Sequence, residues 1–167
     1  MVYTDYPSPM GKLLLAASER GLAGVYFEGH KHFSGSSGWQ RDDTHAVLQQ
    51  TVQQLDAYFA KQRQQFDLPL DLSGGTAFQQ EVWQALLALP FGSTASYASI
   101  ARHIGRPAAV RAVGAANGRN PISIIVPCHR VIASSGALTG YAGGLANKKI
   151  LLTLESAAMS GFNQRMV

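Results

Sequence analysis

The chain has a single cysteine, Cys128, and the residue after it is a histidine, His129. A thiol beside an imidazole suits a protein that attacks an electrophilic carbon through sulfur, because the imidazole can take up the thiol proton. Pro127 fits the first position of a helical turn, where amide N–H groups favour thiolate over thiol. The sequence therefore predicts a nucleophilic thiolate at Cys128, with a small buried hydrophobe as the alternative.

The composition is that of a folded protein suited to a reducing compartment. Of its 167 residues, 46% are hydrophobic and 14% charged, which allows one good core or two small ones and argues against disorder. One cysteine can form neither an internal disulfide nor a cysteine-based zinc site. The first residues do not resemble a signal peptide, and no apolar run is long enough to span a membrane. We expect a cytoplasmic protein that does not associate with membranes.

Charge is divided unevenly between the two halves of the chain. Residues 1–81 carry six Lys/Arg and nine Asp/Glu (−3), whereas residues 82–167 carry eight and one (+7), within a formal net charge of +4. The basic half favours a polyanionic partner, most plausibly nucleic acid, and a solvated basic face is the alternative. The single carboxylate of that half is Glu155.

The first half predicts a small antiparallel sheet covered by a helix. Tight turns separate strand-forming runs in residues 2–27, and residues 43–61 place apolar side chains at helical spacing. The histidines His30, His32 and His45 could suggest a metal site. Without cysteine or clustered carboxylates beside them, we expect surface histidines and no metal.

The second half begins after a glycine-containing stretch at residues 72–75 and is predicted to be mainly helical. Thr76 and Gln79 have the spacing of a capping box that opens a helix through residue 89. Ser96 can cap a short helix through residue 103, which a turn joins to a helix over residues 108–116. Helix, short turn and helix is a DNA-binding arrangement.

The second helix of that pair is unusual because Arg111 is almost its only bulky side chain. Small residues such as Ala112 and Gly114 would let it approach another backbone closely. Packing against its own protein is one explanation of this surface. The other is that a lone long cation enters a DNA groove or fills a gap in the base stack.

Motifs along nearly the whole chain resemble those of the O6-alkylguanine-DNA alkyltransferases, also called methylated-DNA–protein-cysteine methyltransferases. The run Pro127-Cys128-His129-Arg130-Val131 is similar to the active-site motif of that family. Further similar motifs follow the family's order: Phe78-Gln79-Gln80-Glu81-Val82-Trp83, Ser96-Tyr97, Arg111-Ala112-Val113-Gly114, Asn120-Pro121, Gly140-Tyr141-Ala142-Gly143-Gly144 and Lys148 to Glu155. Several spaced motifs are more specific than any one of them.

The resemblance implies an α+β fold with two domains. Residues 1–73 would form a small ribonuclease-H-like sheet-plus-helix domain, and residues 74–167 a mainly helical, winged-helix-like domain with the helix-turn-helix and all of the catalytic machinery. It also implies a monomer that binds double-stranded DNA in the minor groove, with cooperative binding left open. No cofactor is expected.

The implied reaction is direct repair of DNA that carries O6-alkylguanine, and of O4-alkylthymine as a second substrate. The damaged base would be flipped out of the duplex, and Cys128 would take the alkyl group by in-line displacement. Because a thioether has no good leaving group, water would not release it. Each protein would act once.

The resemblance gives several residues a catalytic role. His129 would draw the proton from Cys128 through a bridging solvent molecule, and Glu155 would hold and polarise the imidazole. Asn120 would tie the active-site turn in place, although an ordinary Asn-Pro turn is the alternative. Tyr97 would donate to the guanine ring, with a core tyrosine as the alternative.

Other residues would contact DNA. Arg111 would occupy the space left by the flipped base, or contact phosphate alone in the milder interpretation. A loop with Tyr141 and Gly143 would close over the base, and backbone groups of Cys128, Val131 and Ala142 would read its edge. Ser123, which stands where some members have proline, and the loop at residues 133–136 would affect tolerance of bulky alkyl groups. The DNA-contacting set is Arg111, Ala112, Gly114, Val131, Tyr141, Ala142 and Gly143.

Two other functions compete with this interpretation. A Cys-His-Glu set could serve a thiol hydrolase, which would leave the basic half and Arg111 unexplained. A binding-only relative that recognises alkylated bases would lack the cysteine. Cys128, His129 and Glu155 together argue against that second alternative.

Overall fold

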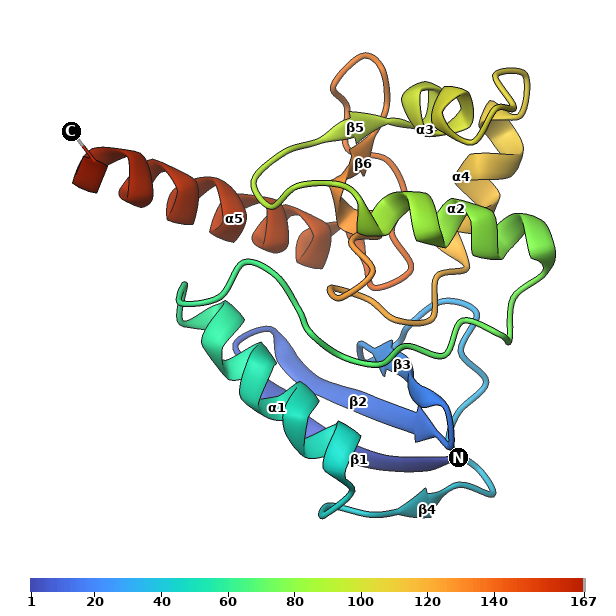
Figure 1. Ribbon diagram of the computed structural model, residues 1–167, viewed down its shortest axis with the longest axis vertical. Coiled ribbons are helices and arrows are strands. Elements are labelled where there is room, and N and C mark those ends of the chain that lie inside the picture. The colour runs from blue at the N-terminus through green and yellow to red at the C-terminus, as the bar shows by residue number, and fades with distance from the viewer. Residues whose placement is uncertain (167) are drawn as a thin grey trace.

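The computed structural model describes the backbone of residues 1–166 and the side chains of residues 1–156. It has a sheet layer formed by the first half of the chain and a group of helices formed by the second (Figure 1). The predicted α+β fold is confirmed. Residue 167, where the expected second domain ends, lies outside the described residues.

The sheet layer is a meander of three antiparallel strands with a short fourth strand at its edge. Strands β1 (Val2–Ser8), β2 (Gly11–Ser18) and β3 (Gly21–Tyr26) follow one another, and β4 (Gln40–Arg41) pairs in parallel with β1. Helix α1 (Ala46–Phe59) packs against the sheet (Figure 1) and buries Leu48, Leu55 and Tyr58. In β2, the buried residues Leu13, Leu15 and Ala17 occupy alternate positions and therefore share one face of the sheet.

The helical half contains the elements expected from its caps. Helix α2 (Ala77–Leu87) begins with the predicted capping box, in which Thr76 and Gln79 satisfy each other's backbone N–H groups. Ser96 caps helix α3 (Tyr97–His103), and a turn leads into helix α4 (Val110–Gly118). The predicted helix-turn-helix is therefore present.

Four further elements complete this half. Cys128–Arg130 form a single 3-10 turn, η1. The short strands β5 (Ala95–Ser96) and β6 (Val131–Ile132) pair in parallel, and helix α5 (Leu145–Met166) extends away from the body (Figure 1).

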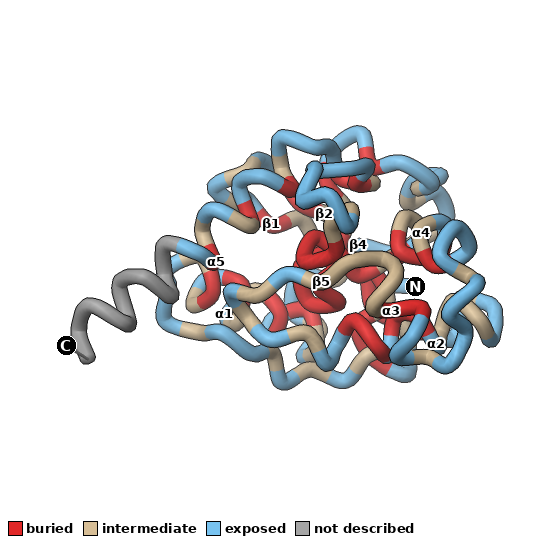
Figure 2. Tube along the Cα trace, turned by 90° about the horizontal axis from the view of Figure 1, so that it is seen from above, coloured by how far each residue is buried: buried red, intermediate tan, exposed pale blue. Residues whose placement is uncertain are grey.

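Backbone hydrogen bonds join the two halves at the edge of the sheet. In β3, the Val25 N–H donates to the Pro121 carbonyl at 2.9 Å, and the Val25 carbonyl accepts from the Ser123 N–H at 3.3 Å. Buried side chains of both halves form one apolar core, which Figure 2 shows concentrated in the middle of the molecule. The segment that leads to Cys128 is thus anchored on the sheet of the first half.

His30 is an exception to the predicted surface histidines. Its side chain is buried, and its Nδ1 accepts the Phe27 N–H at 3.4 Å. Burial, with a smaller contribution from the charge of His32, lowers the pKa of His30 to about 4. The surface prediction was wrong for His30 because aromatic neighbours on the strand end, Tyr26 and Phe27, enclose its ring.

Candidate active site

The turn that carries Cys128 is held by the side chain of Asn120. Its Nδ2 donates to the Val126 carbonyl at 2.8 Å and to Cys128 Sγ at 3.1 Å. Its Oδ1 accepts the Ile122 N–H at 3.0 Å. Asn120 therefore closes the segment that precedes Cys128 and also contacts its sulfur directly.

Within that segment, Ile124 adopts a left-handed backbone conformation, with φ of 73°. Such a conformation is costly for a β-branched residue, on the order of 1–3 kcal/mol. Ile124 is almost completely buried, and the backbone hydrogen bonds of its neighbours hold the tight turn, with the Ile125 N–H donating to the Ser123 carbonyl at 2.9 Å. This turn aims Cys128 into the protein.

Cys128 is a buried thiol with a raised pKa. Burial raises the pKa to about 11, although the Asn120 hydrogen bond and the charge of Lys148 act in the opposite direction. The prediction that the helical turn would favour thiolate was wrong. The turn spans only three residues, so its aligned dipoles are few, and loss of solvent around the sulfur outweighs them.

A buried ion pair lies directly beyond the cysteine. His129 Nε2 contacts Glu155 Oε2 at 2.7 Å, and Arg130 donates from Nε to Oε1 at 2.8 Å and from Nη2 to Oε2 at 3.0 Å. Burial raises the pKa of Glu155, but the bonds and charges of His129 and Arg130 outweigh it and bring the pKa to about 2. Glu155 is therefore a carboxylate that orients His129.

The other ring nitrogen of His129 has no protein partner. Nδ1 is buried and makes no hydrogen bond to any described residue. Burial lowers the pKa of His129 more than Glu155 raises it, so the ring is neutral at rest. With Nε2 bonded to the carboxylate, Nδ1 is the ring atom that can receive a proton.

Sequence reasoning missed a residue of the first half that reaches this carboxylate. Tyr58, in α1, donates its hydroxyl to Glu155 Oε2 at 2.7 Å across 97 residues of sequence. The sequence placed all of the catalytic machinery in the second half, and this bond shows that a residue of the first half contacts one member of it, Glu155. No local pattern signals this contact, because a buried tyrosine on a helix looks the same whether its partner is water or a carboxylate.

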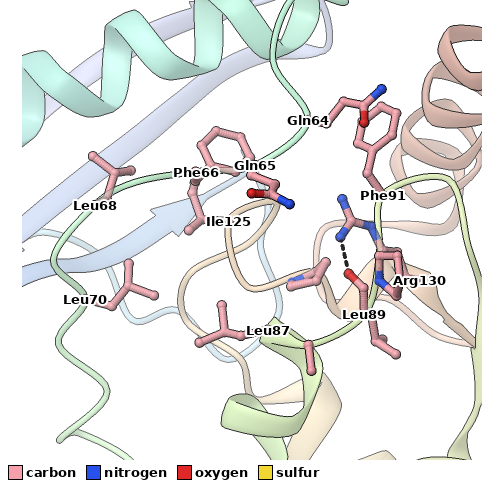
Figure 3. Close-up of a pocket in the computed structure, with 13 residues that line it drawn as sticks. Gln64, Gln65, Phe66, Leu68, Leu70, Leu87, Leu89, Phe91, Ile125 and Arg130 are labelled. Carbon is pink, nitrogen blue, oxygen red and sulfur yellow. Dashed lines mark hydrogen bonds between the residues drawn. The ribbon is translucent and has the colours of Figure 1, made fainter. Parts of the chain in front are cut away.

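Arg130 is itself fixed at a cleft between the two halves. Its Nη1 donates to the Leu89 carbonyl at 2.8 Å, the bond drawn in Figure 3, and its guanidinium lies 5.6 Å from the centre of the Phe91 ring. The cleft has a volume of about 420 Å³ and is otherwise lined mainly by apolar residues of the 66–70 and 87–91 segments. The guanidinium is thus clamped on several sides.

Lys148 is a second buried cation of the site. It begins the second turn of α5 and donates from Nζ to the Val131 carbonyl at 2.7 Å and to the Thr139 carbonyl at 2.9 Å. These bonds fold the 131–139 loop against α5. Lys148 lies in the motif from Lys148 to Glu155 that resembles the family, but the sequence predicted no role for it.

The loop with Tyr141 packs against the first half. The Tyr141 ring is buried edge-on against Phe27, with 6.0 Å between ring centres. Gly143 is also buried, and a Cβ there would lie 2.3 Å from the Phe27 ring. The Ala142 carbonyl accepts the Lys31 N–H at 2.9 Å. Close approach of Phe27 therefore explains the glycine at 143.

The helix-turn-helix presents the remaining candidate residues. Arg111 and Ala112 are exposed on α4, whereas Gly114 faces the Tyr97 ring at 3.8 Å from the position of a Cβ. The Tyr97 hydroxyl hydrogen-bonds to the Thr139 hydroxyl at 3.0 Å. Val131 is buried next to η1. Cys128, His129, Glu155 and Asn120 therefore form one cluster, and Arg111 lies outside it.

The described side chains contain no group of three or more His, Cys, Asp or Glu that could hold a metal ion. Among the described helices, none combines the length and apolar character needed to cross a membrane.

Comparison with known proteins matches both halves of the chain to one family. Residues 1–72 match the family model described as "6-O-methylguanine DNA methyltransferase, ribonuclease-like domain", and residues 77–157 match the model of its "DNA binding domain". A methylated-DNA–protein-cysteine methyltransferase of Methanosarcina acetivorans is 48% identical over 94% of this chain and 99% of its own, and that of Mycobacterium leprae is 50% identical over 89% and 88%.

A solved structure of a similar protein supports the same family. The crystal structure of Mycobacterium tuberculosis OGT in complex with DNA superposes with a TM-score of 0.87 at 47% identity, over 95% of this chain and 94% of that one. The family models, the relatives and the shared fold all point the same way: this chain belongs to the methylated-DNA–protein-cysteine methyltransferases, the family that repairs DNA by alkyl transfer.

Proposed function

We propose that the protein transfers the alkyl group of O6-alkylguanine in duplex DNA to Cys128, once per molecule. The single observation that carries the proposal is the cluster in which Asn120 donates to Cys128 Sγ at 3.1 Å while Glu155 holds the adjacent His129 at 2.7 Å. The only cysteine of the chain lies in that cluster. The DNA complex of the similar Mycobacterium tuberculosis protein supports DNA as the partner.

The reaction begins with removal of the thiol proton. Because burial holds the pKa of Cys128 near 11, the thiol needs a base at neutral pH. Proton transfer to His129 Nδ1, through a solvent molecule, leaves a thiolate whose charge the Asn120 amide stabilises. The new imidazolium is paired with Glu155.

The displacement then exchanges one bond for another. The thiolate forms a bond to the alkyl carbon as that carbon's bond to guanine O6 breaks, and the electron pair passes to the guanine ring. The Tyr97 hydroxyl donates a hydrogen bond to that ring and stabilises its developing negative charge. The product is an uncharged thioether, which water does not cleave, so the protein is consumed.

Access of the base to a buried sulfur requires the base to leave the helix. We propose that Arg111, exposed on α4 beside Ala112, takes the place of the flipped base, and that Gly114 of the same helix leaves room for the Tyr97 ring. The loop of Tyr141, Ala142 and Gly143 covers the base, and backbone groups of Val131 and its neighbours read the base edge. O4-alkylthymine would enter the same pocket.

We also propose that the protein binds in the minor groove as a monomer, as the family resemblance implies. Phosphate contacts from the basic half would make binding salt-sensitive and tolerant of sequence. The ends of the two family matches, at residues 72 and 77, support a division into domains 1–73 and 74–167. We also propose a cytoplasmic location, because a reactive thiol survives in a reducing compartment.

The test is methyl transfer to the purified protein from duplex DNA with one O6-methylguanine. We expect a gain of one methyl group in intact mass, mapped to Cys128 by peptide fragmentation and absent in Cys128→Ser. A folded protein that binds the DNA without gaining mass would instead be a recognition protein. Repeated turnover on an acyl substrate would identify a thiol hydrolase.

A further inference from the structure

We propose that Tyr58 is a positioning residue of the alkyl transfer: from the first half of the chain, its hydroxyl fixes the Glu155 carboxylate and limits how strongly that carboxylate stabilises protonated His129. The inference rests on the proposed function for its effect on the transfer rate. It extends the site from the second half of the chain to α1.

The two oxygens of Glu155 are used unequally. Oε2 receives three contacts, from His129 Nε2 at 2.7 Å, from the Tyr58 hydroxyl at 2.7 Å and from Arg130 Nη2 at 3.0 Å. Oε1 receives one, from Arg130 Nε at 2.8 Å. Tyr58 and His129 therefore compete for the negative charge of the same oxygen. Each additional hydrogen bond to this oxygen reduces the stabilisation that it gives to the other donors.

Burial and ring packing hold the Tyr58 side chain in place, so its bond to Glu155 is a fixed contact. It is completely buried, and its ring packs against Phe59, Phe66 and Phe91, of which Phe91 also packs against Arg130. The hydroxyl has no other partner among the described residues, and its burial keeps it from bulk water. Burial, followed by the charge of Glu155, raises the pKa of Tyr58 far above its ordinary value, so the hydroxyl stays protonated and donates at every working pH.

The pH at which His129 becomes protonated depends on all the charged and titratable groups around it. The surrounding charged groups are Glu155 and Lys148 from α5 and Arg130 from the same turn, with the Cys128 thiol and the Tyr58 and Tyr141 hydroxyls nearby. Only Glu155 favours the imidazolium. Without the Tyr58 bond, Oε2 would carry more negative charge, and His129 would become protonated at a higher pH.

A base that is already protonated cannot accept the thiol proton. The transfer rate should therefore fall, as pH decreases, around the pKa of His129. In Tyr58→Phe, we expect the midpoint of this fall to move up by about one pH unit. Looser alignment of Glu155 should also lower the plateau rate by about two- to tenfold.

Tyr6→Phe is a matched control in the same half of the chain. Tyr6 is also buried, and its hydroxyl donates to a carboxylate, Asp56 Oδ1, at 2.6 Å. This variant loses the same chemical contact without touching Glu155. Its transfer rate and its pH midpoint should equal those of the wild type.

The experiment is single-turnover methyl transfer over about pH 4.5 to 8.5 for the wild type and both variants, with an NMR titration of the His129 ring in parallel. The amount of methyl taken up counts folded molecules, and the rate constant reports the chemistry, so misfolding of Tyr58→Phe would not resemble a shifted midpoint. An upward shift of both the rate midpoint and the His129 titration in Tyr58→Phe alone supports the proposal.

Two results would overturn it. One is an unchanged His129 titration in folded Tyr58→Phe, and the other is an equal shift in Tyr6→Phe, which would assign the effect to general destabilisation. A wild-type protein that takes up no methyl group would contradict the proposed function instead. The His129 titration would still decide whether Tyr58 controls the proton affinity of the ring.

Discussion

Arg130→Met should destabilise the protein strongly, because it leaves Glu155 as a buried charge. The change removes the two bonds to the carboxylate, at 2.8 and 3.0 Å, and the bond to the Leu89 carbonyl at 2.8 Å. Only 1% of the Glu155 side chain is exposed. Breaking a buried pair by removing one partner costs about 3–5 kcal/mol. For a protein of this size, that corresponds to a fall of about 10 °C in Tm.

Arg106→Met is a close control because Arg106 has the same two kinds of neighbour on the surface. Its guanidinium bonds Glu81 at 3.1 Å and lies 5.7 Å from the centre of the Phe78 ring, but about half of each charged side chain is exposed. Solvent screening limits such a pair to about 0–1 kcal/mol. Urea unfolding at neutral pH should therefore separate the two variants by about 3 kcal/mol.

The reasoning would be refuted if Arg130→Met lost no more free energy of unfolding than Arg106→Met. A second comparison isolates the unpaired charge. Adding Glu155→Gln to Arg130→Met should restore part of the stability, because an amide is less costly to bury than a carboxylate without its cation. If the double variant lost, relative to the wild type, the sum of the free energies that the two single variants lose, the two residues would not be coupled.

Two further predictions concern a buried histidine, His30, and a tightly packed glycine, Gly143. The pKa of His30 is lowered to about 4, so its stabilising effect is complete above its unfolded value of about 6.5 and is lost as pH falls toward 4, on the order of 3 kcal/mol. Urea unfolding across this range should show a smaller dependence on pH in His30→Asn, and an equal dependence would contradict the assignment. Gly143→Ala should cost about 1–3 kcal/mol, because its Cβ would lie 2.3 Å from the Phe27 ring. Gly140→Ala, which meets nothing within 4 Å, should be nearly neutral in thermal unfolding.

Short sequence patterns were sufficient to predict the helices whose starts are set by nearby capping residues. The capping box of Thr76 and Gln79 and the cap at Ser96 gave the starts of α2 and α3 correctly, since each is complete within four residues. The cysteine–histidine pair and the isolated Glu155 were found because their residue types are rare in this half of the chain.

Contacts between distant segments could not be predicted in the same way. Tyr58 and Glu155 are 97 residues apart, and neither carries a signal of the other. The direction of the Cys128 pKa shift depends on how completely the surrounding strands and loops exclude solvent, which no short motif encodes. His30 is a local exception: the aromatic rings that enclose it, Tyr26 and Phe27, lie only three to four residues before it, but their nearness in sequence does not show how the three rings pack.

The burial of Cys128 also affects how long a protein molecule that has not yet reacted keeps its thiol intact. Oxidation to sulfenic acid and reaction with stray electrophiles both proceed from the thiolate. With a pKa of about 11, roughly one molecule in ten thousand carries a free thiolate at neutral pH. Under the proposed function, each molecule uses its only thiol in one repair event, and a reactive thiolate would lose that thiol to peroxide or metabolic by-products. Under that proposal, a thiol that stays protonated until a damaged base enters the site would preserve the number of functional protein molecules.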